Sequence, residues 1–309
     1  MRTLQILQCS ECLHRFSGAP GKYKRYPLTA ILNAISTFNL GHSITETERI
    51  MRQRFHLNIP QRTIQSWLKE HKSITTYARL RSVGKKFFDP LLVLKTLLLR
   101  HQQVYRFQIH QPKLELLAND SFSGLKKYLV SIASDFPHTL FLGTRQRSST
   151  FSADLHAPIA TKQNHATRTA ALVLPISPSN KKRHETLQRF MLVNDSVTIA
   201  IEIPVYLTRH DIEYYRRCGF ICDFEAEIVT GHIDFLQIRN GFLHILDYKP
   251  DADKERHAHI QLTLYALALA RRANLPLKNF KCGWFDEKGY FEFFPLQAVS
   301  APRPQTSKS

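Results

Sequence analysis

Two aspartates, Asp234 and Asp247, lie on either side of a predicted β-hairpin, where they could hold a divalent metal ion. Asn240-Gly241 between two apolar runs is the strongest short-range signal for a two-residue hairpin turn. In the register set by this turn, counting back along both strands places Asp234 directly opposite Asp247. Directly opposed like charges destabilise a sheet, so we expect a cation between them. Two carboxylates offer the hard oxygen ligands that Mg²⁺ prefers.

Lys249 lies two residues after Asp247 and therefore points to the same face of the strand, across from His232. Beside a metal ion, its amine could orient or help deprotonate an attacking water, or stabilise charge on a phosphate. The plainer alternative is a buried ion pair in which Lys249 only neutralises one carboxylate. His232 could contact phosphate or pack against Lys249. The predicted register favours the metal site.

This pattern resembles the catalytic core of the PD-(D/E)XK nuclease superfamily, particularly its RecB-like and CRISPR-associated exonuclease branches. The resemblance rests on Gly231-His-Ile-Asp234, the hairpin, Asp247-Tyr-Lys249 and a following helix, and it covers roughly residues 185–296. It implies a restriction-endonuclease-like fold in which Asp234 and Asp247 bind Mg²⁺ or Mn²⁺ and Lys249 assists phosphodiester hydrolysis. We expect the carbonyl group of Tyr248 as a further metal ligand.

The helix predicted from Glu255 to about Arg272 carries Gln261 and Tyr265 on one face, because they are four residues apart. In the resembled nucleases, this pair lies beside the site and touches DNA or positions the lysine. The alternative is an ordinary aromatic at the edge of the core and a solvent-exposed glutamine. The neighbouring hairpin favours a role in the site.

A third acid has three candidates. Glu202 is the first choice, because it lies alone in the apolar run from Thr198 to Tyr206, where a buried carboxylate needs a reason. Glu185 occupies a helix-like stretch, which is the usual position in many of the resembled nucleases. Glu227 leads directly into the hairpin. Each of them could instead be a plain surface or strand-edge charge.

The amino-terminal region predicts a helix-turn-helix. Apolar periodicity predicts a helix over Leu28–Phe38, Ser43 with Glu46 forms a capping box for a second helix, and Pro60 opens a third that ends near His71. The third helix could enter the major groove of DNA, although three-helix units also serve as protein-interaction modules. The residues expected to reach bases are Gln61, Arg62, Thr63 and Gln65, with Lys69 on phosphate.

This region also resembles the DNA-binding part of bacterial insertion-sequence transposases. Cys9-Ser-Glu-Cys12 looks like the second half of the zinc ribbon that precedes the helices in those proteins. Structural Zn²⁺ takes four ligands, and no second pair follows. Either the first half is missing or the two cysteines are a relic without metal, and we favour no zinc site. No acidic triad of a transposase follows, so the resemblance implies binding without transposition.

The sequence predicts an α/β fold, with a mixed sheet flanked by helices, behind an all-α helix-turn-helix domain. We assign residues 1–82 to that first domain, 83–170 to a partly helical connecting region, 171–298 to the nuclease-like domain and 299–309 to a disordered tail. In the connecting region, Asp89–Gln102 is predicted as a helix that is too short to span a bilayer, and Val104–His110 as a strand.

Composition agrees with a nucleic-acid partner. The chain has 43 Lys and Arg against 25 Asp and Glu, a formal net charge of +18, which attracts polyanions. We find no signal peptide and no membrane-spanning run, and the five cysteines suit neither a disulfide pattern nor an iron–sulfur cluster. We therefore expect a cytoplasmic, Mg²⁺-dependent DNA nuclease. The alternatives are a catalytically silent DNA-binding regulator or mobile-element accessory protein, and a nuclease acting on RNA.

Overall fold

The computed structural model describes residues 6–8, 15–17, 26–143, 148, 155–222, 224 and 226–300. The chain divides into two compact units, which we describe separately. The first contains residues 1–38 and 42–71, and the second contains residues 39–41 and 72–309. Within the described ranges, none of the helices combines the length and the apolar character that crossing a bilayer requires.

The first unit is built from three short helices, as the sequence predicts. They are α1 (Leu28–Asn39), α2 (Ile44–Phe55) and α3 (Gln61–Glu70), and a small antiparallel pair, β1 (Ile6–Gln8) and β2 (Arg15–Ser17), precedes them. The capping box is confirmed, because the Ser43 side chain accepts from the backbone N–H of Glu46 and the Glu46 carboxylate accepts from that of Ser43. Cys9 and Cys12, the candidate zinc ligands, lie outside the described residues.

The second unit contains an eight-stranded mixed sheet with the strand order β3-β4-β6-β7-β8-β9-β10-β5. Strands β8 and β9 are parallel, and the other neighbours are antiparallel. The strands are β3 (Leu94–His101), β4 (Gln103–His110), β5 (Ala160–Thr161), β6 (Thr198–Thr208), β7 (Ile228–Arg239), β8 (Phe242–Tyr248), β9 (Phe280–Phe285) and β10 (Tyr290–Phe293).

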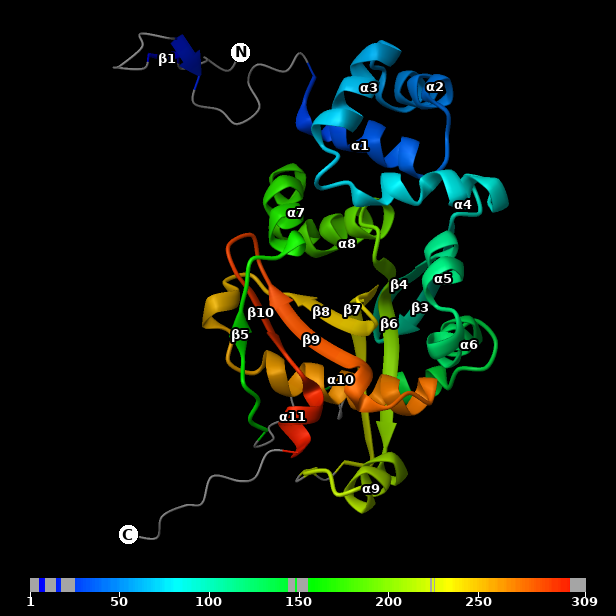
Figure 1. Cartoon of the computed structure of the whole chain (residues 1–309), viewed down its shortest axis with the longest axis vertical. Helices are drawn as coiled ribbons and strands as arrows, with labels where there is room; N and C mark the ends of the chain where they lie inside the picture. Colours follow the sequence, from blue (N-terminus) through cyan, green and yellow to red (C-terminus); the bar gives the residue numbers. More distant parts are fainter. Residues whose placement is uncertain are drawn as a thin grey trace. The chain divides into compact units, whose positions relative to one another are not determined.

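Helices cover both faces of this sheet (Figure 1). The pair α7 and α8 lies on one side, while α6 and the long α10 lie on the other, where they share the main apolar core with the strands. The helices are α4 (Arg81–Phe87), α5 (Gln111–Leu117), α6 (Ser123–Ser131), α7 (His165–Val173), α8 (Arg183–Asn194), α9 (Arg209–Arg217), α10 (Ala258–Ala273) and α11 (Pro295–Ser300).

Short 3₁₀ helices connect these elements. They are η1 (Thr76–Arg79), η2 (Asp120–Phe122), η3 (His138–Phe141), η5 (Leu174–Ile176), η6 (Asn180–Lys182), η7 (Ala252–Lys254) and η8 (Leu277–Asn279). The mixed sheet with helices on both faces confirms the predicted α/β class.

Two local predictions are wrong. The helix expected over Asp89–Gln102 is instead strand β3, because this segment pairs along its whole length with β4 and thereby joins the sheet. The disordered tail was expected from Val299, but Val299 is fully buried in α11 and the helix continues to Ser300. Apolar residues in a run predict burial, and tertiary pairing decides between helix and strand.

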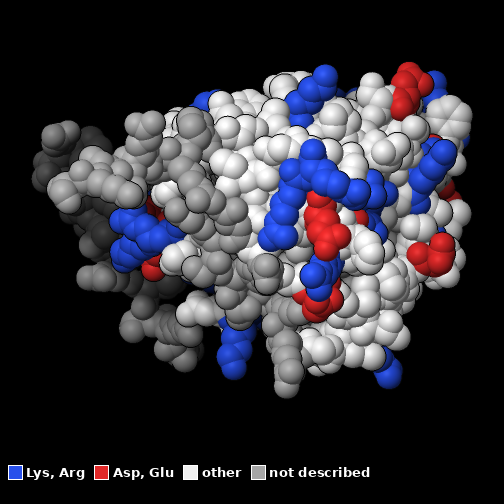
Figure 2. All heavy atoms as spheres, turned by 90° about the horizontal axis from the view of Figure 1, so that it is seen from below, with Lys and Arg blue, Asp and Glu red and all other residues white. Residues whose placement is uncertain are grey.

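The excess of positive charge does not form an unbroken basic surface at the α9 end of the molecule. In this view, acidic side chains lie among the basic ones of the described residues (Figure 2). Ion pairs such as Arg209–Glu213, at 3.2 Å, account for part of this mixing.

Candidate active site

The predicted hairpin register is confirmed from Arg239–Phe242 to Phe235–Leu246. Beyond that last pair, β7 stays paired with β6 while β8 stays paired with β9, so the two strands separate. Asp234 and Asp247 are the first residues past the fork. Each offers a carboxylate oxygen, and these oxygens lie within 4.8 Å of each other and of a ring nitrogen of His184.

Glu202 reaches the same place from the third strand. The β6–β7 pairs Ile201–Phe235 and Ile203–Ile233 flank Glu202 and Asp234, so the register places these two acids opposite each other. Glu202 has a φ of 54°, a left-handed conformation that is costly for a residue with a side chain and that interrupts the ladder here. The Gln188 amide donates to the Glu202 carboxylate at 2.6 Å. The acids therefore form a row across β6, β7 and β8.

His184 was not among the predicted site residues, yet its ring lies against Asp234. Its Nε2 is 2.5 Å from Oδ2 of Asp234, and the backbone N–H of Tyr248 donates to the same oxygen at 3.2 Å. His184 lies in the first turn of α8, beside Glu185. That neighbourhood was the one available signal, because a single histidine on a predicted helix forms no motif by itself.

The predicted chain of side chains behind Asp247 is present. The Lys249 amine lies 2.9 Å from the Asp247 carboxylate and donates to the Gln261 carbonyl at 3.2 Å. The Gln261 amide in turn donates to the hydroxyl of Tyr265 at 2.8 Å. The Tyr265 ring lies where a side chain at position 231 would be, so Gly231 allows this close approach. Helix α10 thereby fixes the position of the lysine.

The site is electrostatically polarised. Burial raises the pKa of Asp234, but the neighbouring His184 outweighs it and lowers this pKa to about 2. Burial and the charge of Asp234 raise the pKa of Asp247 well above its ordinary value. Burial and Asp234 also raise the pKa of Glu202, to about 7. The charges of Asp234, Asp247 and Glu202 therefore disfavour one another, and a cation placed among them would relieve this repulsion.

Burial shifts the pKa of the cationic groups in the other direction, because it disfavours their charged forms. Burial lowers the pKa of His184, but Asp234 and the other acids raise it to about 9. Burial likewise lowers the pKa of Lys249, and Asp247 more than compensates, so that the net shift is upward. In the metal-free protein, His184 and Lys249 thus balance part of the acidic row.

The other candidates lie farther from this cluster. Glu185 lines the same pocket but faces Arg106 at 3.7 Å. Glu227 is exposed and pairs with Arg209 at 3.2 Å. His232 lines the same pocket as Lys249. Its ring stacks on Tyr105 at 3.6 Å and hydrogen-bonds to His101 at 2.9 Å.

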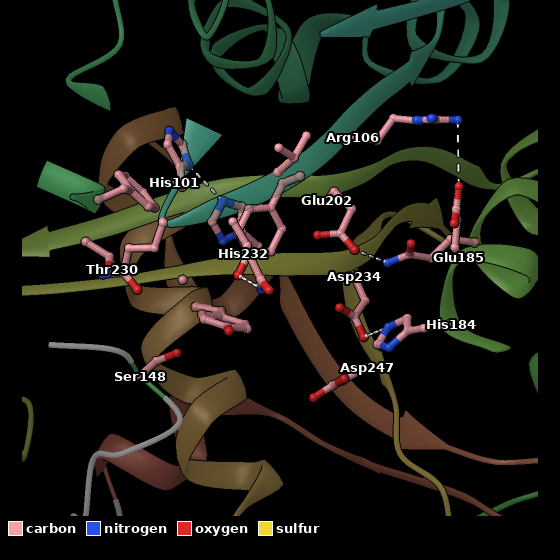
Figure 3. A pocket seen from close by; sticks show the side chains of 18 of the residues that line it. His101, Arg106, Ser148, His184, Glu185, Glu202, Thr230, His232, Asp234 and Asp247 are labelled. Atoms are coloured by element: carbon pink, nitrogen blue, oxygen red, sulfur yellow. Dashed lines mark hydrogen bonds and ion pairs between the residues drawn. The ribbon is translucent and has the colours of Figure 1, made fainter. Parts of the chain in front are cut away.

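These side chains line a pocket of about 560 Å³. Its walls come from β3, β4, β6, β7, β8, α8 and α10, which are far apart in the sequence. In Figure 3, Asp234 lies between His184 and Asp247 with Glu202 beside it, while His101 and His232 lie on the other side. The pocket thus has an acidic wall facing an aromatic one.

The predicted DNA-contacting residues lie on α3 of the first unit. Gln61, Arg62, Gln65 and Lys69 are exposed and Thr63 is half-buried, while Ile64 and Trp67 face the small core. Gln61 is engaged within the unit, because its amide donates to Glu48 at 3.0 Å. The exposed face is therefore polar and basic, and its contact with DNA stays a prediction.

Comparison with known proteins gives one finding. Residues 162–294 match the sequence profile of the PD-(D/E)XK nuclease superfamily. No curated protein and no solved structure matches the chain. The matched segment contains the acidic row, Lys249, Gln261 and Tyr265, and it contains His184 as well. Residues 162–294 of this chain therefore form a domain of the PD-(D/E)XK nuclease superfamily.

Proposed function

We propose that the protein is a metal-dependent DNA nuclease that hydrolyses phosphodiester bonds. The observation that carries this proposal is the convergence of His184, Asp234 and Asp247 within 4.8 Å, with the Lys249 amine 2.9 Å from Asp247. A buried ion pair alone would explain one acid and one amine. It would leave the second aspartate, Glu202 and the open pocket without a purpose.

The donor set fits a hard divalent cation. Two carboxylates suit Mg²⁺ or Mn²⁺, and an imidazole ligand shifts the preference toward Mn²⁺. The upward shift in the pKa of Asp247, caused by burial and by Asp234, means that a positive charge placed here would be stabilised. We propose His184, Asp234 and Asp247 as side-chain ligands and keep the Tyr248 carbonyl as a predicted fourth ligand.

When bound, such an ion polarises the scissile phosphate and lowers the pKa of a coordinated water. The chain itself would supply the geometry. Burial lowers the pKa of Lys249, and Asp247 raises it by more in the metal-free protein. From its place beside Asp247, the amine would orient or help deprotonate the attacking water, or stabilise charge on phosphate oxygens. Gln261 holds that amine from the other side at 3.2 Å. Gln188 fixes Glu202 beside the ligands.

DNA is the proposed substrate because the first unit carries three short helices, and the third of them, α3, is the one that we predict to enter the major groove. Arg62 and Lys69 are exposed on its third helix. The net charge of +18 agrees with a polyanionic partner. The helix-turn-helix would target the nuclease domain to its substrate. Cytoplasmic location stays a prediction from the sequence.

Two single variants test the proposal. Asp247→Ala and Lys249→Ala should abolish Mg²⁺- or Mn²⁺-dependent cleavage of circular, linear and single-stranded DNA, while DNA binding in EDTA survives. Asp253→Ala and Lys254→Ala, which change exposed residues of η7, are the matched controls and should cleave normally. Unchanged activity in the first pair would end the catalytic assignment.

Calorimetry distinguishes a metal-dependent nuclease from a DNA-binding protein without catalytic activity. Mn²⁺ should bind the unaltered protein and bind Asp234→Ala much more weakly. A protein that binds DNA but shows no metal site dependent on Asp234 and Asp247 would be a catalytically silent DNA-binding regulator. Parallel assays with RNA decide which nucleic acid is cut.

A further inference from the structure

The outer end of the β3–β4 hairpin presents a face on which apolar and basic side chains alternate. Pairing places Leu98 opposite Arg106 and Arg100 opposite Val104, and side chains two residues apart on a strand share a face. Leu98 and Val104 are 60% and 66% exposed. Two exposed apolar side chains do not mark a contact surface by themselves, so the groups that lie beside them decide whether this face is one.

This face belongs to the wall of the nuclease pocket. Leu98, Val104 and Arg106 line the same cavity as Asp234 and Asp247. In Figure 3, Arg106 reaches across to Glu185 at the edge of that cavity. A strand of nucleic acid whose phosphate lies at the acidic row would therefore meet the hairpin.

The hairpin is held in place by the aromatic residues on its opposite face, which also line the pocket. On its opposite face, the His101 ring is buried and stacks on Phe141 with a centroid distance of 4.2 Å. Tyr105 stacks on His232 in an almost parallel arrangement, with 8° between the ring planes. These contacts hold the hairpin in one position. Its exposed face can therefore contact a substrate without a change in the backbone.

Charge favours nucleic acid over a second copy of the chain as the partner. Strand β3 is the outermost strand of the sheet and also carries exposed Lys95 and Arg100. Within the part of the chain that the structure describes, Arg100 has no ion-pair partner. Pairing two copies of β3 would bring like charges together, which destabilises a sheet. Phosphates would instead be attracted to these cations.

We propose that Leu98 and Val104 form a wedge that unstacks the base beside the scissile phosphate as a DNA strand enters the pocket. This inference rests on the proposed nuclease function and adds how the substrate is admitted. A pocket of about 560 Å³ has the size of a small-molecule site, so it takes an unstacked nucleotide and not a duplex. Apolar side chains inserted at a base step are a recurrent way to open the stack, and Arg100 and Arg106 would hold the adjoining phosphates.

The test uses a DNA duplex with 2-aminopurine at its end, because this base fluoresces more strongly when it is unstacked. Binding is measured with Ca²⁺ in place of Mg²⁺. We expect fluorescence to rise with the unaltered protein and most of the rise to be lost in the double variant Leu98→Gln/Val104→Thr at saturating protein. Val130→Thr changes an exposed valine on α6 and is the matched control.

Cleavage provides a second readout. With Mg²⁺ or Mn²⁺, the double variant should cut duplex ends about tenfold to a hundredfold more slowly, the scale expected when a Leu or Val side chain loses its apolar contact, and single strands at the normal rate. An equal fluorescence rise in both proteins would refute the wedge. So would a change of oligomeric state in the variant, since the face would then be an interface between copies.

The experiments distinguish failure of the proposed nuclease function from failure of the proposed wedge. If the unaltered protein cuts no DNA, the nuclease function fails, whereas the fluorescence assay needs no turnover. If cleavage depends on Asp247 and Lys249 but the fluorescence rise does not depend on Leu98 and Val104, only the wedge is wrong.

Discussion

A methyl group at position 231 should disturb the site through helix α10. A Cβ added to Gly231 would lie 2.2 Å from Cε1 of Tyr265 and 2.8 Å from its hydroxyl oxygen. The Tyr265 ring is only 6% exposed, so it has little room to move, and overpacking of this kind costs about 1–3 kcal/mol of stability. Displacing Tyr265 also displaces Gln261 and, through it, Lys249. A misplacement of about 1 Å at a catalytic group costs about a hundredfold in rate.

A double-mutant cycle measures this effect. Urea unfolding should show Gly231→Ala less stable than the unaltered protein by about 1–3 kcal/mol, and nearly neutral when Tyr265→Ala has already removed the ring. Tyr265→Phe is the matched control, because it keeps the ring and removes only the partner of Gln261. If Gly231→Ala costs the same stability in both backgrounds, the ring is not the obstacle and the reasoning is wrong.

Three further predictions follow from the same geometry. His184→Ala should weaken Mn²⁺ binding by at least about tenfold in calorimetry, while the exposed His210→Ala leaves it unchanged. Burial and neighbouring positive charges lower the pKa of His244 from 6.5 to about 3, so below pH 6.5 the unfolded chain binds a proton that the folded chain excludes. Stability should therefore fall as the pH drops, by about 2 kcal/mol down to about pH 5, and urea titrations of His244→Gln should lack this loss. Arg62→Ala and Lys69→Ala should each lower the salt dependence of DNA binding by about one unit of slope, and unchanged slopes would remove α3 from the interface.

The sequence was sufficient to predict those contacts of the site that lie within one hairpin or one helix. A two-residue turn sets the register of its own hairpin, which is why Asp234 and Asp247 could be brought together from the position of Asn240-Gly241 alone. Helical spacing did the same for Gln261 and Tyr265, which are hydrogen-bonded in the structure. In each case, the partners lie within one hairpin or one helix.

The parts that were missed depend on pairing between distant segments. His184 reaches Asp234 only because α8 packs against β6, a contact that no local pattern encodes. The segment Leu94–His101 is apolar enough for a buried helix, and its partner strand decided the outcome. The stacking of His232 on Tyr105 was missed for the same reason. The sequence does not show that the β3–β4 hairpin, which contains Tyr105, lies near β7.

The fork between β7 and β8 links the predictable and unpredictable parts. A hairpin that stayed paired to its end would satisfy its backbone groups between the strands and hold the two aspartates in a closed ladder. Because pairing stops at Phe235–Leu246, the N–H of Tyr248 is left to donate to Asp234, and α10 can approach close enough for Gln261 to reach Lys249. The opening of the sheet thus creates the pocket and orients the acids within it, and it requires the neighbouring strands β6 and β9 to hold each arm of the fork.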